Sequence, residues 1–167
     1  MSRVRPIPRS SDPAHEELGG YTTVLAIYGA ATSMMLLVAS RRGKLPGRFR
    51  VVDLAMFGIA AHKLARTVAT DAVTRPIRAP FTDEATTAAE TPVEVPARTG
   101  WRKPLGELFT CPFCLGQWSA TAFVVGSMFA PAPARAVASI LVVRSVSDWL
   151  QLGFGGLERL ATGGDEK

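Results

Sequence analysis

The chain has few of the residues that most enzymes use for chemistry. It contains two cysteines and two histidines in 167 residues, and aromatic residues make up 8% of the sequence. A single pair of cysteines, Cys111 and Cys114, excludes a disulfide framework. The sequence also lacks Walker A, GxGxxG, HExxH and GxSxG motifs. Nucleotide-binding, zinc-protease and serine-hydrolase functions are therefore not indicated.

Acidic residues are outnumbered by basic ones, giving a formal net charge of +5 and an isoelectric point near 9.8. A basic chain can bind nucleic acid, contact anionic lipid, or set membrane topology through cytoplasmic Lys and Arg. Zinc-finger spacing, an RNA-recognition motif and a long Lys/Arg run are all missing, so no nucleic acid partner is expected. Lipid contact and topology are the preferred interpretations.

Charge is missing altogether from Leu18 to Ser40, a run of 23 residues. About 20 apolar residues, each rising 1.5 Å along a helix, cross the hydrocarbon core of a bilayer. The run is longer than the roughly 7–15 apolar residues of a cleavable signal, and acidic Glu16 and Glu17 precede it. It therefore predicts a retained signal anchor, with the lipid bilayer as the chain's first partner.

We predict an all-α fold, a small polytopic membrane helix bundle of about four membrane-length helices with one long polar loop. The predicted helices cover residues 18–40, 51–70, 112–130 and 135–157, the loop covers 71–110, and polar tails cover 1–17 and 158–167. The middle of the loop is rich in Thr, Ala, Glu and Pro, which is typical of a mobile segment without a core. Pro131 and Pro133 are expected to separate the last two helices.

The second predicted helix, 51–70, is less apolar than the first. At 100° per residue, His62, Lys63 and Arg66 fall within one arc of its surface, and the remaining surface is mostly apolar. A spanning helix with one polar stripe is the preferred interpretation. The alternative is an amphipathic helix that lies on the lipid headgroups.

The last predicted helix carries Arg144 and Asp148 four residues apart, with Gln151 on the same face. A charge near the bilayer centre costs roughly 2.5–3.5 kcal/mol on insertion scales, so these charges are expected to be paired. A structural ion pair between them is the preferred interpretation. A polar pathway shared with the stripe of the second helix, as in a small transporter, is the alternative.

The most suggestive local motif is Cys111-Pro112-Phe113-Cys114. Pro112 suits the first turn of a helix, and Thr110 is the expected N-cap. This placement puts both sulfurs on one side of a helix N-terminus, where the positive end of the dipole favours a thiolate. Three interpretations stay open: structural thiols, thiol–disulfide redox chemistry, and zinc bound through both cysteines with further ligands or a second copy.

Two blocks of the sequence are distinctive in their order and spacing. The first is Ala61-His-Lys-Leu-Ala-Arg66 with Asp71-Ala-Val-Thr-Arg-Pro-Ile-Arg78-Ala-Pro-Phe81, and the second is Leu105-Gly-Glu-Leu-Phe-Thr-Cys-Pro-Phe-Cys-Leu-Gly-Gln-Trp118. They resemble the bacterial membrane family called domain of unknown function 1360, which includes a Bacillus sporulation membrane protein. The resemblance implies a small multi-helix integral membrane protein without an assigned activity. It marks as motif positions Arg66, Asp71, Arg78, Phe81, Cys111, Cys114, Gly116 and Trp118.

These observations predict a multi-pass protein of the bacterial inner membrane. The preferred function is a non-enzymatic structural or interaction protein whose cysteine turn meets a membrane protein partner or a second copy. The alternative is a thiol–disulfide redox or metal-binding protein that uses Cys111 and Cys114. Asp71 and Arg78 are expected to pair with each other or to anchor a partner, and Trp118 to lie at the bilayer interface. Basic residues slightly favour a cytoplasmic cysteine turn, although those of the turn 41–50 argue for the opposite topology.

Overall fold

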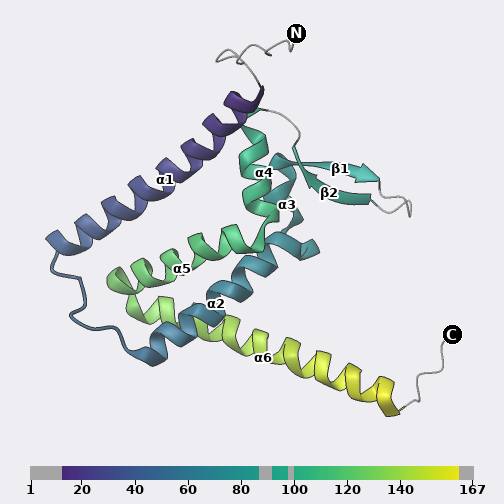
Figure 1. Ribbon diagram of the computed structural model, residues 1–167. Helices are drawn as coiled ribbons and strands as arrows, with labels where there is room; N and C mark the ends of the chain where they lie inside the picture. Colours follow the sequence, from purple (N-terminus) through teal and green to yellow (C-terminus); the bar gives the residue numbers. More distant parts are fainter. Residues whose placement is uncertain (1–12, 87–91, 98–99, 162–167) are drawn as a thin grey trace, which may run out of the picture.

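The structure is a computed structural model that describes residues 13–86, 92–97 and 100–161. Within these ranges it is mostly helical, with one small hairpin (Figure 1). The elements are α1 (Pro13–Arg41), α2 (Val51–Thr70), η1 (Ala72–Thr74), α3 (Arg75–Arg78), η2 (Ala79–Phe81), β1 (Thr82–Thr86), β2 (Pro92–Pro96), α4 (Arg102–Thr110), α5 (Pro112–Phe129) and α6 (Pro131–Ala161). The predicted tails lie largely outside the described residues, but α6 continues four residues beyond its expected end at 157.

Two of the described helices are long and apolar enough to cross a membrane: residues 18–41 of α1 and the whole of α6. The expectation of four such helices is not confirmed. Helix α2 has the predicted range but carries three charged side chains, Asp53, Lys63 and Arg66, over its 20 residues. Helices α4 and α5 pass the same test only when taken together, and they are bent by 83° at their junction.

The packed core lies where α2 meets α5 and the first half of α6 (Figure 1). Phe57 of α2 stacks on Phe123 of α5 with ring centroids 5.7 Å apart. Small residues of α2, such as Ala60 and Ala61, are buried beside this stack, with Ala138 of α6 on the other side. Because alanines present little bulk, the helix axes can approach closely, and the two phenylalanines fill the remaining space.

The segment 71–110 is not one long loop, which corrects the sequence-based prediction. It contains the short helices η1, α3, η2 and α4, and an antiparallel hairpin in which Thr82 faces Pro96 and Thr86 faces Pro92. Gly106 allows α4 to lie directly on this hairpin, because a Cβ there would come within 2.3 Å of the Phe81 carbonyl oxygen. Composition alone does not reveal such packing, since it depends on contacts between separate elements. The tip of the hairpin, 87–91, lies outside the described residues.

The two ends of the bundle carry different structures. The first half of α1 lies beside α4, near the hairpin, whereas its C-terminal end lies away from them (Figure 1). From that end the chain turns through residues 42–50 into α2, and Lys44 Nζ donates a hydrogen bond to the Phe129 carbonyl at 3.4 Å. The connection between α1 and α2 is therefore tied to the turn between α5 and α6.

Candidate functional site

The cysteine pair sits at the corner between α4 and α5. Cys111 is the N-cap of α5, and its Sγ accepts a hydrogen bond from the Cys114 backbone N–H at 3.3 Å. The prediction of Thr110 as the cap is wrong, because Thr110 is the last residue of α4 and its hydroxyl donates to the Gly106 carbonyl at 2.8 Å. Both thiols are free, with Cys111 half-buried and Cys114 exposed.

The two thiols have different acidities, and their turn lies outside α1 and α6. The pKa of Cys111 is lowered, first by a hydrogen bond from the Cys114 thiol and then by the backbone N–H groups of Cys114 and Phe113. The same sulfur–sulfur contact, burial and the negative charge of Cys111 raise the pKa of Cys114 to about 11. Cys111 is therefore the thiol that ionises first and is the better nucleophile.

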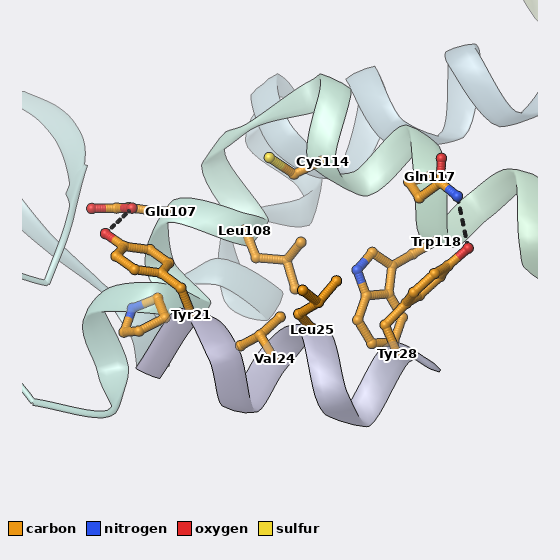
Figure 2. Close-up of a pocket in the computed structure, with 10 residues that line it drawn as sticks. Tyr21, Val24, Leu25, Tyr28, Glu107, Leu108, Cys114, Gln117 and Trp118 are labelled. Carbon is orange, nitrogen blue, oxygen red and sulfur yellow. Dashed lines mark hydrogen bonds between the residues drawn. The ribbon is translucent and has the colours of Figure 1, made fainter. Parts of the chain in front are cut away.

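Beside this turn lies a groove of about 440 Å³ between α1 and the α4–α5 corner. Figure 2 shows Cys114 with the residues that line it, including Val24, Leu25 and Leu108. Two polar bridges tie α1 to the opposite wall: the Tyr21 hydroxyl donates to Glu107 Oε2 at 2.5 Å, and Gln117 Nε2 donates to the Tyr28 hydroxyl oxygen at 2.7 Å (Figure 2). The groove thus combines an apolar lining with a thiol and polar bridges to α1.

Sequence reasoning missed the residues that α1 contributes to this groove. Tyr21 and Tyr28 lie within a run that the sequence presents as lipid-facing, and their partners are 86 and 89 residues away. Trp118, expected at the bilayer interface, packs edge-on against Tyr28 with ring centroids 5.0 Å apart. The only signal of this contact in the sequence is the spacing of the two tyrosines, which are seven residues apart and therefore lie on one face of the helix.

Arg144 and Asp148 of α6 pair with residues of α2 and its C-cap and not with each other, which corrects the predicted Arg144–Asp148 pair. Lys63 Nζ donates to Asp148 Oδ2, and Arg144 Nη2 lies 3.4 Å from Asp71 Oδ2 at the end of α2. Positions four apart on one helix can form a pair, but a buried lysine on the neighbouring helix competes for the same carboxylate. The side chain of Lys63 is 11% exposed, so an unpaired ammonium there would be costly.

The predicted polar stripe of α2 is split by this packing. Lys63 is buried against α6, whereas His62 and Arg66 are exposed. Gln151, expected to join the charges of α6, donates to Ser147 Oγ on its own helix at 3.5 Å. Of the proposed polar pathway, the structure therefore joins Lys63 and Asp148 in one ion pair and places the charges of Arg66 and Arg144 near the same carboxylate.

The comparison with protein families establishes to which family the chain belongs. The model of the family described as "Protein of unknown function (DUF1360)" matches residues 56–154, which is more than half of the chain. The chain belongs to the DUF1360 family. Comparison with curated proteins gave no match, and neither did comparison with solved structures. The matched segment contains the cysteine turn and the Lys63–Asp148 and Arg144–Asp71 ion pairs, whereas α1 lies outside it.

Within the DUF1360 segment, Arg78 is the most buried charged side chain among the described residues, with 4% of its surface exposed. Its Nη2 lies 2.7 Å from Glu94 Oε2, and its Nη1 donates to the carbonyls of Val68 at 2.7 Å and Asp71 at 3.0 Å. Arg78 and Asp71, which were expected to pair with each other or to anchor a partner, are in contact through the Asp71 backbone carbonyl, whereas the Asp71 carboxylate faces Arg144. Arg78 joins the C-terminus of α2 to the hairpin.

Two other motif positions differ in how they are packed. Phe81 stacks on Phe109 of α4 at 5.2 Å and meets Trp101 edge-on at 6.1 Å, so it holds α4 to the connection before the hairpin. A Cβ at Gly116 would meet nothing within 4 Å, so packing within one copy does not require glycine there.

Metal binding through the cysteine pair stays a prediction. Among the described residues, no group of three or more His, Cys, Asp and Glu side chains is placed to hold a metal ion. Cys111 and Cys114 would fill half of a tetrahedral zinc site, so a second copy or another protein would have to supply the remaining ligands.

Proposed function

We propose that the chain is a multi-pass integral protein of the bacterial inner membrane that acts without catalysis, as a structural or interaction protein. The observation that carries the membrane assignment is the exposure of α1 and α6. In the most apolar 18-residue window of each helix, 6% of the residues in α1 and 11% in α6 are buried. Contact between water and the exposed apolar side chains of these helices is unfavourable, whereas contact with lipid tails is favourable.

The second half of α6 illustrates the argument. It extends beyond the bundle (Figure 1) and carries large apolar side chains such as Trp149, Leu152 and Leu160, which are 72%, 76% and 81% exposed. Burying each such side chain is worth roughly 1.5–3 kcal/mol in water. Soluble monomers rarely expose a contiguous apolar surface of this kind to water. In a bilayer, lipid tails contact the same surface without a free-energy penalty.

The described charges support a non-catalytic role, because most of them link one element to another. Lys63 and Asp148 join α2 to α6, and Arg135 joins α6 to Asp53 of α2. By contrast, Phe113 projects from the cysteine turn with 91% of its surface exposed. An aromatic side chain presented in this way at a helix corner suits contact with a membrane protein partner or a second copy.

A photo-crosslinking amino acid at Phe113 tests the interaction role in intact cells. We expect irradiation to give one discrete adduct in the membrane fraction, with a second copy of the chain or with another membrane protein. The matched control is the same substitution at Val73, which is 80% exposed in η1, and it should give no such adduct. Equal labelling at both sites, or crosslinks to lipid alone, would contradict the proposal.

A second candidate is thiol–disulfide exchange, favoured by the position of Cys111 as N-cap and by its lowered pKa. The Cys111 thiolate would attack a disulfide of a partner protein, forming a mixed disulfide and releasing one partner thiolate. Cys114 would lose its proton and attack the Cys111 sulfur, releasing the second partner thiolate. The partner is reduced and the Cys111–Cys114 disulfide is formed.

Labelling of both thiols in intact cells distinguishes the two candidates. An impermeant maleimide reports the side of the membrane on which the turn lies, and labelling with and without prior reduction reports the redox state. Exchange chemistry requires a measurable disulfide fraction that disappears in Cys114→Ser. Thiols that stay fully reduced while the Phe113 crosslink persists would support the interaction role alone.

A further inference from the structure

A cavity of about 240 Å³ with several charged side chains in its lining lies at the end of the bundle opposite the hairpin. It is enclosed by the turn between α1 and α2 and by the turn between α5 and α6. Its charged lining consists of Lys44, Arg48, Arg50, Arg135 and Asp53. Four basic side chains therefore face one carboxylate.

The single carboxylate is already engaged. Arg135 donates to both oxygens of Asp53, from Nε at 3.1 Å and from Nη2 at 2.8 Å. The hydrogen bonds from Arg135 lower the pKa of Asp53, and the nearby charge of Arg50 adds to this effect. Asp53 is consequently ionised at neutral pH and neutralises one guanidinium, which leaves the charges of Lys44, Arg48 and Arg50 in excess.

The basic side chains that Asp53 does not neutralise lie on the turn between α1 and α2. Arg48 forms no ion pair with any side chain in the part of the chain that the structure describes, and Lys44 contacts the carbonyl and the ring face of Phe129. The N-cap of α2, Arg50, has no side-chain hydrogen bond to the first turn of that helix. The positive end of the α2 dipole thus adds to the field of these side chains.

The position of the cavity relative to the bilayer indicates which kind of anion can bind there. The apolar run of α1 ends at Arg41, just before this turn, and α6 begins at Pro131, which lines the cavity. If α1 and α6 cross the bilayer, as the proposed function holds, the cavity lies at the level of the lipid headgroups. A phosphodiester there meets arginines that can donate two hydrogen bonds each, and Phe49 lines the apolar side.

We propose that this cavity binds the phosphate of an anionic phospholipid headgroup, with Arg48 and Arg50 as its principal ligands. The inference rests on the proposed membrane function and adds a defined lipid site to it. Both arginines lie in the turn that follows α1, outside the segment matched by the DUF1360 model.

The test uses the full chain, purified in a neutral detergent, and three probes. Dioctanoyl phosphatidylglycerol is the expected ligand, dioctanoyl phosphatidylcholine is the zwitterionic control, and inorganic phosphate is the free anion. Binding is measured by native mass spectrometry and by microscale thermophoresis. The cavity variant is Arg48→Gln/Arg50→Gln. The matched variant is Arg41→Gln/Arg42→Gln, which removes the same charge from neighbouring residues that do not line the cavity.

We expect the cavity variant to bind phosphatidylglycerol about tenfold more weakly than the unaltered chain, and the matched variant to lose less than about twofold. Phosphatidylcholine should bind at least about tenfold more weakly than phosphatidylglycerol. Equal losses in the two variants would mean diffuse attraction and would overturn the site. Inorganic phosphate that binds as tightly as phosphatidylglycerol would overturn the lipid assignment and indicate a free-anion site.

Failure of this inference is distinguishable from failure of the membrane assignment. Alkaline carbonate extraction of cell membranes reports insertion for every variant. A chain that resists extraction but has no preference for phosphatidylglycerol contradicts the headgroup site alone. A chain that carbonate releases contradicts the proposed membrane function. Circular dichroism of both arginine variants confirms that they keep the helical fold.

Discussion

Arg78 is the residue whose replacement tests the packing of the DUF1360 segment most sharply. Its side chain is 5% exposed and pairs with Glu94, which is 17% exposed. It also donates to two carbonyls at the C-terminus of α2, those of Val68 and Asp71. Arg78→Gln keeps a polar side chain of similar length but removes the positive charge and most of these hydrogen bonds. Both carbonyls then lose this donor, and Glu94 keeps only its pair with the more exposed Arg75.

The structure sets the size of the expected effect. Removing one partner of a buried ion pair costs about 3–5 kcal/mol, because the remaining charge stays partly desolvated. A change of 1 kcal/mol shifts the melting temperature of a domain of this size by roughly 2–4 °C. We therefore expect Arg78→Gln to lower the melting temperature by roughly 10 °C. Arg78→Lys keeps the charge but loses the planar, multiply bonded geometry, so its loss should be intermediate.

Arg75→Gln is the matched control. Arg75 also pairs with Glu94, at 3.0 Å, but its side chain is 51% exposed. Exposed pairs contribute about 0–1 kcal/mol, so the melting temperature should change by less than about 4 °C. The measurement is thermal unfolding of the purified proteins in one neutral detergent, at one scan rate. An Arg78→Gln protein as stable as the unaltered chain, or an Arg75→Gln protein equally weakened, would refute the reasoning.

Two further predictions follow from the thiols and from the glycines. Alkylation rates measured by mass spectrometry from pH 6 to pH 11 should rise first at Cys111, below the ordinary thiol pKa, and at Cys114 only as the pH approaches its pKa of about 11, because only the thiolate reacts. Simultaneous labelling at the ordinary pKa would contradict the hydrogen bond between them. Gly106→Ala should cost about 1–3 kcal/mol of stability, because its Cβ would meet the Phe81 backbone oxygen at 2.3 Å. At Gly116 the added Cβ would meet nothing within 4 Å, so Gly116→Ala should raise the stability by about 0.5–1 kcal/mol through its higher helix propensity. Thermal unfolding measures both changes, and equal effects of the two substitutions would contradict this prediction.

The helices were the most predictable part of the fold. The range 51–70 is that of α2, and the apolar run from residue 18 lies within α1. These features follow from local periodicity and from the absence of charge, which a sequence displays directly. The end of α6 was harder to place, because Gly153, Gly155 and Gly156 weaken a helix locally, whereas the observed α6 continues to Ala161.

The hairpin and the groove were beyond the reach of local reasoning. The hairpin pairs Glu94 with arginines 16 and 19 residues earlier, and Thr- and Pro-rich composition conceals such pairing. The groove depends on Tyr28 of α1 meeting Trp118 of α5, a contact between distant segments. The Arg144–Asp148 pair was predicted on spacing alone. Spacing along one helix says nothing about the neighbouring helix, which carries Lys63.

The central claim is that α1 and α6 face lipid, and spin-label accessibility in reconstituted vesicles tests it most directly. With Cys111 and Cys114 replaced by serine, single labels are placed at Ile27 of α1, Val143 of α6 and Leu45 of the turn between α1 and α2, which are 56%, 69% and 48% exposed. We predict that Ile27 and Val143 are more accessible to oxygen than to a water-soluble nickel chelate, and that Leu45 has the opposite preference. The same chelate accessibility at all three positions would contradict the account.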